Sequence, residues 1–214
     1  MILRNDIEQG SLDWFLIRRG KIGGTLSKGL FVDSDTLLIN LLAEITEPYD
    51  EEESFSSAVM EEGKEKEPDA RVFAEKKLGV QFMQVGWLQS DINILGISPD
   101  GITEDLKESL EIKCPQPAKH IKTLLSQEIP ADNIHQCIHY FTVNPHLEKH
   151  HFLSFRPESI SDHFLKTITR DCMVNIGTEK TKKMIKVSDA VEKALESAEK
   201  IENRINEIIT QLTF

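Results

Sequence analysis

The clearest pattern of apolar and polar positions lies at the C-terminal end of the chain. Between residues 187 and 212, apolar side chains recur at spacings of three and four, at Val187, Val191, Leu195, Ala198, Ile201, Ile205, Ile208 and Leu212. This period matches one face of an α-helix. We therefore expect a long amphipathic helix that packs either on the core or on another subunit.

The N-terminal segment shows helix signals of two kinds. Ser11 can cap a helix over 12–19, and Gly20 stands where a helix can end. The run 36–45 is almost continuously apolar. We expect a short capped helix followed by a buried one.

A longer helix is expected after an acidic loop. Residues 50–53 are all acidic and read as a solvated charge run. Helix-forming residues then dominate 57–78, with Gly63 and Pro68 placed to bend the helix.

Short strands are expected in the middle of the chain, where segments are apolar-rich or alternate. They cover 80–89, 92–97, 110–114 and 150–155. Helices are expected over 118–125 and from Asp132 or Asn133 to 141. After Ser159 or Ser161 we expect the chain to become helical.

This order of elements predicts an α/β fold. A central mixed β-sheet should be flanked by helices, with the long C-terminal helix added to it. We expect a single domain over 1–214, with its core at about 10–155 and a C-terminal helical part at about 158–214.

The charge of the chain argues against a nucleic-acid partner, since DNA-binding proteins usually have a basic surface. The net charge is −11. However, residues 44–75 contain twelve acidic and three basic residues, a net charge of −9 that leaves only −2 for the rest. Because one segment dominates the total, a basic surface elsewhere is still compatible with the sequence.

Cysteine content and hydropathy bear on the cellular setting. The three cysteines have no paired spacing: Cys114, Cys137 and Cys172. The first residues have no signal-peptide apolar core, and no apolar run approaches the roughly 18 residues that span a bilayer. We expect a cytoplasmic protein without disulfides and without a membrane partner.

The chemistry is concentrated in residues 96–115. Asp100 lies in a Ser-Pro-Asp-Gly turn signal, and Glu111-Ile112-Lys113 follows in a strand-like run. Alternate side chains of a strand share a face, so Glu111 and Lys113 should point the same way and Ile112 the opposite way. If the segments after Asp100 and before Glu111 pair as a hairpin, the two carboxylates and the ammonium group meet.

Such a set suits metal-assisted cleavage of phosphodiesters. Mg²⁺ prefers oxygen ligands, which Asp100, Glu111 and the carbonyl of Ile112 can supply, and Mn²⁺ should substitute for it. A bound metal lowers the pKa of a coordinated water, and Lys113 can orient that water and stabilise charge developing on the phosphate. The alternative is an ordinary turn and a strand with a surface Glu–Lys pair.

Flanking segments resemble the phage lambda exonuclease or YqaJ-type viral recombinase branch of the PD-(D/E)xK nucleases. The chain matches its signatures over about residues 10–155, in the family's order. The first matched signatures are Trp14 with residues 18–22, then residues 41–44, and then Gly63-Lys64 with residues 67–70. The later ones are S-P-D-G at 98–101, L-E-I-K-C-P at 110–115, and Gln136.

The resemblance implies roles at the metal site. Asp100 and Glu111 would be the principal metal ligands, and Lys113 the catalytic lysine. Glu67 would lie near the metals and act partly through water, although a solvated helix face is its alternative. Gln136 would orient substrate or water beside Lys113.

The resemblance also implies contacts with DNA. Arg18 and Thr25 would hold the 5′-phosphate, and Met60 would wedge open the terminal base pair, unless it is core packing. One departure stands out, because Gly23-Gly24-Thr25 replaces the family's T-A-S. His135 and His139 share a metal-ligand spacing, but positions on the surface or beside Gln136 are favoured over a zinc site.

The function implied is a Mg²⁺-dependent 5′→3′ exonuclease. It would degrade one strand of linear double-stranded DNA to mononucleotides for phage-type recombination. The resemblance further implies a ring-shaped homotrimer, a single-strand annealing protein as partner, and a phage or prophage origin. The alternatives are a RecB-like repair nuclease or endonuclease, and a non-catalytic DNA-end-binding module.

Overall fold

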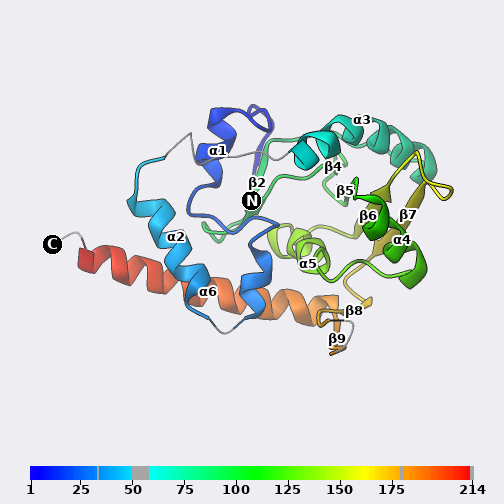
Figure 1. Ribbon diagram of the computed structural model, residues 1–214. Helices are drawn as coiled ribbons and strands as arrows, with labels where there is room; N and C mark the ends of the chain where they lie inside the picture. Colours follow the sequence, from blue (N-terminus) through cyan, green and yellow to red (C-terminus); the bar gives the residue numbers. More distant parts are fainter. Residues whose placement is uncertain (33, 50–57, 179–180, 213–214) are drawn as a thin grey trace.

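A four-stranded mixed β-sheet forms the centre of the structure, with helices on both of its faces (Figure 1). The structure is a computed structural model that describes residues 1–32, 34–49, 58–178 and 181–212, with the backbone alone for 58–64. The predicted α/β class is therefore confirmed. The acidic run 50–53 lies outside the described residues.

The order of strands in the central sheet is β4-β5-β6-β7. Their bounds are Gly101–Ile102, Glu108–Lys113, Lys149–Phe155 and His163–Ile168. β5 and β6 are parallel, whereas the two outer pairs are antiparallel. A parallel pair needs a long crossover, and here α4 (Pro117–Ser126) and α5 (Ile134–Val143) provide it.

The two faces of the sheet are covered by different helices because side chains alternate along the strands. Leu153 packs with Ala70 and Ala74 of α3 (Ala58–Leu78), whereas Phe152 belongs to the larger cluster that includes α5. α3 runs unbroken through Pro68. The sheet is thus the middle of three layers.

Smaller elements complete the N-terminal half. A three-stranded sheet has the order β1-β2-β3, formed by Ile2–Arg4, Trp87–Gln89 and Gly96–Ile97. α1 (Leu12–Arg18) begins at Ser11, whose hydroxyl accepts the N–H of Trp14 as predicted. η1 (Ser27–Phe31) and α2 (Thr36–Thr46) follow.

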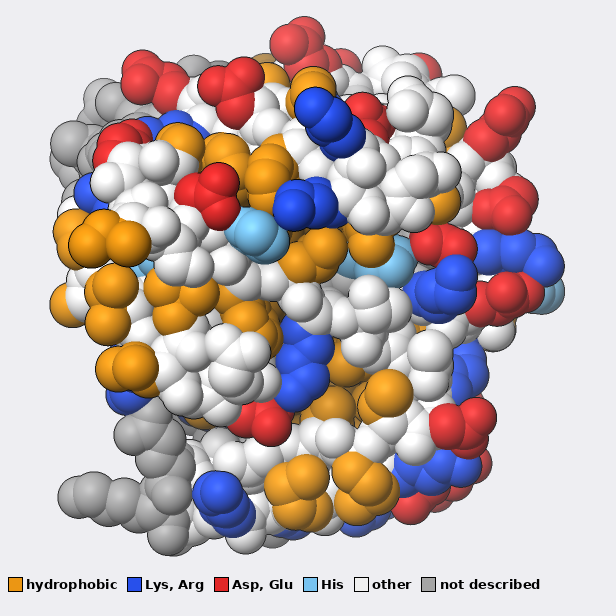
Figure 2. Space-filling view, turned by 90° about the vertical axis from the view of Figure 1, so that its right-hand side faces the viewer, with side chains coloured by type: hydrophobic (Ala, Val, Ile, Leu, Met, Phe, Trp, Pro, Cys, Tyr) orange, Lys and Arg blue, Asp and Glu red, His pale blue; other side chains and the backbone are white. Residues whose placement is uncertain are grey.

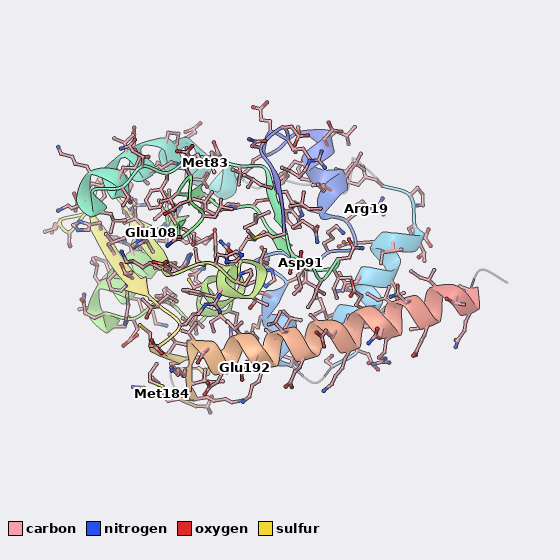
Figure 3. All side chains as sticks on the ribbon, turned by 180° about the vertical axis from the view of Figure 1, so that it is seen from behind. Arg19, Met83, Asp91, Glu108, Met184 and Glu192 are labelled. Carbon is pink, nitrogen blue, oxygen red and sulfur yellow. The ribbon has the colours of Figure 1, made fainter. Side chains whose placement is uncertain are left out.

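The long C-terminal helix α6 (Val187–Leu212) packs on the core of its own chain. It contacts α2, α5 and η1, and Val191, Ala198 and Ile205 are buried there. Figure 3 shows it extending along one side of the molecule, with Glu192 near its first turns. The periodicity therefore identified the helix and its buried face correctly.

The expectation of a helical part from about 158 was wrong. The chain first adds β7 to the central sheet, and then forms a hairpin of β8 (Met173–Asn175) and β9 (Met184–Lys186). β7 pairs with the free side of β6 along its full length, which satisfies backbone groups that a helix would have left exposed. The core thus extends beyond residue 155.

The strands expected at 80–89 and 92–97 are shorter in the structure. Only β2 and β3 are laddered, while Met83 forms a single bridge with Ile102 and the N–H of Gly86 donates to the carbonyl of Arg4. A side chain at Gly86 would collide with the Ile7 carbonyl, so the chain passes too close to its neighbour for a regular ladder.

Within the described residues, no helix combines the length and the apolar character that crossing a bilayer requires.

Burial predicts how two leucines differ in their contribution to stability. Leu110 of β5 is fully buried, and Leu212 of α6 is 66% exposed. Leu110→Ala should lower the free energy of unfolding by about 2–5 kcal/mol, because it leaves a cavity between the sheet and α3. Leu212→Ala should change it by less than about 0.5 kcal/mol. Urea unfolding of both variants measures this, and equal losses would contradict the assignment of the core.

Candidate active site

The hairpin expected between Asp100 and Glu111 is present. Gly101 pairs with Leu110, which places the turn residue Asp100 beside the C-terminal half of β5. Oδ2 of Asp100 accepts the N–H of Ile112 at 2.7 Å. The C=O of a strand residue leaves on the same side as its N–H, so the Ile112 carbonyl also faces the edge where Asp100 lies.

The turn that carries Asp100 is held by three distant side chains. Nε of Arg71 in α3 donates to the Asp100 carbonyl at 2.8 Å. Nε2 of Gln9 donates to the Pro99 carbonyl at 3.0 Å, and Nε1 of Trp14 donates to Oγ of Ser98 at 2.8 Å. Because the backbone of the turn is fixed at each of these positions, Asp100 is oriented by the scaffold rather than by its own loop.

Glu111 and Lys113 point to the same face of β5, as the alternation predicted. Their side chains form an ion pair through Oε1 and Nζ. Glu111 is only 1% exposed, and its other oxygen, Oε2, accepts the hydroxyl of Tyr140 at 2.6 Å. Ile112 points the opposite way, into the apolar cluster beneath α3. Asp100, Glu111 and Lys113 therefore converge.

The convergence leaves an excess of negative charge. Burial raises the pKa of Asp100 well above its usual range, and the carboxylates of Glu111 and Glu67 raise it further. Burial of Lys113 favours the neutral amine, but Glu111 and Asp100 outweigh this and raise the pKa of the lysine. Glu67 of α3, which is half-buried, therefore lies close enough for its charge to affect Asp100, and its role near a metal stays a prediction.

The donor set fits a hard divalent cation. Two carboxylates and a backbone carbonyl face one edge of β5, and a cation there would offset the repulsion that perturbs Asp100. Across the described residues, no three His, Cys, Asp or Glu side chains form a ready-made metal cluster. A cation would therefore need water or substrate oxygens to complete its coordination.

Arg18 and Thr25 line a common pocket of about 430 Å³ between α1 and α2. The guanidinium of Arg18 lies over the ring of Trp14, 3.8 Å from its centroid. Burial lowers the pKa of Arg18, while Glu44 opposes this shift. Within the described part of the chain Arg18 has no hydrogen-bond acceptor, so its donors are free for an anion.

Two further predicted residues differ in outcome. Gln136 lies against Gly24, where an added Cβ would come within 2.7–2.9 Å of its side chain, so a larger residue there would require the Gln136 side chain to shift. The departure from T-A-S thus opens space for Gln136 next to Thr25. The side chain of Met60 lies outside the described residues, and its wedge role stays a prediction.

Sequence reasoning missed two aromatic residues of this region. Trp14 was noted only as part of a family signature, yet it supports Arg18 with its ring face and the Asp100 turn with its indole N–H. Tyr140 was not singled out, although it follows Gln136 by four residues and so shares its side of α5. His139, expected on the surface or beside Gln136, is buried, and its Nε2 lies 2.9 and 3.0 Å from two backbone carbonyl oxygens.

Comparison with known proteins agrees with this geometry. Residues 13–146 match the model of the YqaJ-like viral recombinase domain. No curated protein matches the chain. Among solved structures, an alkaline exonuclease from Laribacter hongkongensis (LHK-Exo) superimposes with a TM-score of 0.72 and 20% sequence identity. The alignment covers 95% of this chain and 98% of that one, and the same values hold for LHK-Exo in complex with dAMP.

The charge excess predicts that Asp100 reduces stability when no cation is present. Asp100→Asn keeps an oxygen acceptor for the Ile112 N–H but removes a half-buried charge that is close to the charges of Glu111 and Glu67. In EDTA this variant should therefore unfold at equal or higher urea concentration than the parent protein, with a gain of up to about 1 kcal/mol.

Asp105→Asn is the matched control, because Asp105 is exposed and its carboxylate accepts bonds from Thr103 and Lys107. It should be neutral or slightly destabilising. A large loss of stability in Asp100→Asn alone would show that the buried carboxylate is well compensated.

Proposed function

Because the chain belongs to the YqaJ-like viral recombinase family, we propose that it is a metal-dependent nuclease that hydrolyses phosphodiester bonds at the ends of linear double-stranded DNA. The observation that carries this proposal is the convergence of Asp100, Glu111 and Lys113 at one edge of the sheet. We further propose 5′→3′ polarity and mononucleotide products, in line with the exonuclease fold of the similar structures.

The metal is proposed to be Mg²⁺, with Mn²⁺ as a substitute. Asp100, Glu111 and the carbonyl of Ile112 would hold it directly, and Glu67 partly through water. When bound, such an ion polarises a phosphate oxygen and lowers the pKa of a coordinated water. The repulsion among the three carboxylates supports a cation at this position.

The side chain of Lys113 contributes positive charge at the same edge. Its ammonium group stays protonated because of its two acidic neighbours. It can therefore hold the attacking water by a hydrogen bond and stabilise the charge that develops on the phosphate oxygens. The Arg18 pocket, with Thr25 and Gln136 beside it, would hold the 5′-phosphate and so place the next phosphodiester at Lys113.

Local charge supports DNA as the substrate. A pocket of about 910 Å³ opens at Lys113 and is lined by Lys119 and Lys122, with Asp132 as its acidic residue. Its polar wall continues to Asn133 and Ser154. A chain with a net charge of −11 thus concentrates lysines where a phosphodiester strand would approach the acidic pair.

For the assembly we propose a homotrimeric ring, with a single-strand annealing protein as partner in a phage-infected or prophage-carrying bacterial cytoplasm. An exposed apolar strip on α4, formed by Ile121 and Leu125 with Pro117 and Ala118, fits an interface between copies. Figure 2 shows the face of the molecule on which α4 lies, where hydrophobic side chains gather toward one side.

Substitutions at the acidic pair test the proposal. Asp100→Asn and Glu111→Gln should each lower turnover by about 10³-fold, since they remove charge that the metal needs, while far-ultraviolet circular dichroism stays unchanged. The measurement is release of mononucleotides from an end-labelled linear duplex, with Mg²⁺ and with EDTA.

A closed circular duplex is the control substrate and should be spared. Cutting of the circle would instead favour an endonuclease. A parent protein that binds DNA ends but never cleaves them would favour the non-catalytic module.

Arg18 provides a separate test of substrate recognition. Arg18→Ala should remove any preference for 5′-phosphorylated over 5′-hydroxyl ends, a change of about 10- to 100-fold in kcat/KM, because a charge-assisted pair to phosphate is lost. Arg204→Ala is the control, since Arg204 lies on α6 and pairs with Asp35 at the surface. If the preference persists in Arg18→Ala, the 5′-phosphate binds elsewhere.

A further inference from the structure

The hydroxyl of Tyr140 contacts the proposed metal ligand Glu111 directly. It donates to Oε2 of Glu111 at 2.6 Å, and both residues are almost fully buried, at 2% and 1% exposure. The other oxygen of Glu111, Oε1, pairs with Lys113. The two oxygens of this carboxylate therefore have different partners, a phenol from α5 and an ammonium from its own strand.

Tyr140 is itself held by its surroundings. The ring of His150 in β6 stacks on it, with centroids 4.2 Å apart and planes 29° apart. Nδ1 of His150 lies 2.9 Å from Oγ of Ser109, its register partner in β5. The sheet that carries Glu111 thus also carries the ring that fixes the phenol.

A neutral donor suits this position electrostatically. A second cation beside Glu111 would cancel the charge that a metal requires, whereas a phenol supplies a hydrogen bond and no charge. Phenylalanine would fill the same space but would leave Oε2 buried without this donor, and the penalty is larger for a charged acceptor than for a neutral one. The hydroxyl of Tyr140 is therefore required by its hydrogen bond to Glu111, because packing alone would accept phenylalanine.

We propose that Tyr140 is a positioning residue that fixes the orientation of Glu111, so that Oε1 is the oxygen presented to the divalent cation beside Asp100. The inference rests on the proposed function of a metal-dependent nuclease. Tyr140 of α5 would then affect metal affinity through Glu111, without contacting the metal or the DNA itself. Partners that orient metal ligands in this way typically account for 10- to 100-fold in affinity.

The test is Tyr140→Phe, which removes one oxygen atom and keeps the ring. Thr142→Val is the matched control, because Thr142 is also buried in α5 and its hydroxyl bonds only to the carbonyl of Ile138. Mg²⁺ binding to the DNA-free proteins is measured by calorimetry. We expect Tyr140→Phe to weaken Mg²⁺ binding at least tenfold and to raise the Mg²⁺ concentration for half-maximal cleavage equally.

The KM for DNA and the stability of the variants distinguish a positioning role of Tyr140 from a purely structural one. At saturating Mg²⁺ the KM for DNA of Tyr140→Phe should match that of the parent, and Thr142→Val should bind Mg²⁺ within twofold of it. Unfolding in EDTA reports the fold of both variants. A variant that loses stability but binds Mg²⁺ like the parent would overturn the proposal.

Glu111→Asp provides an independent check, because its shorter side chain cannot reach both Tyr140 and Lys113. Tyr140→Phe should then add little further loss of Mg²⁺ affinity, whereas an undiminished second loss would show that the two residues act separately. A parent protein that neither binds Mg²⁺ nor cleaves DNA would refute the proposed function itself. A parent that does both, with an unaffected Tyr140→Phe, would refute only the role of Tyr140.

Discussion

The close packing of two acidic side chains, Glu111 buried and Asp100 half-buried, is the constraint on which this structure depends. A buried carboxylate is costly unless donors compensate it. Here the Ile112 N–H serves Asp100, while Lys113 and Tyr140 serve Glu111. These donors come from the C-terminal half of β5 and from α5, which are separated in sequence by α4. The site therefore depends on the tertiary packing of α5 against the sheet.

A second constraint joins the acidic pair to the anion pocket. The indole of Trp14 lies between them, with Arg18 over its ring and its N–H on Ser98 of the Asp100 turn. A displacement of α1 would therefore disturb both places at once. If Arg18 holds a DNA end and the acidic pair cleaves, as proposed, one rigid ring would set the spacing between the two groups, a simple way to make cleavage begin at a terminus.

The sequence predicted the parts of the site that depend on local rules. Alternation along β5 placed Glu111 and Lys113 together, and the turn signal brought Asp100 beside them. Contacts between distant segments were beyond such rules. The sequence around Tyr140 does not indicate that its hydroxyl bonds to Glu111. β7 is recognisable as a strand only from its pairing with the edge of β6 that β5 leaves unpaired. Tertiary pairing, not propensity, decided both.

The proposed DNA substrate must be reconciled with a net charge of −11. At physiological ionic strength charges are screened beyond about 8 Å, so acids of the 44–75 segment that lie farther than this from the cleft would affect DNA binding weakly. Under the proposal, a phosphodiester would meet Lys113, Lys119 and Lys122 on one side and Arg18 on the other at short range. Affinity would then depend on a few close cations, and the acidic remainder would limit non-specific binding to the rest of the duplex.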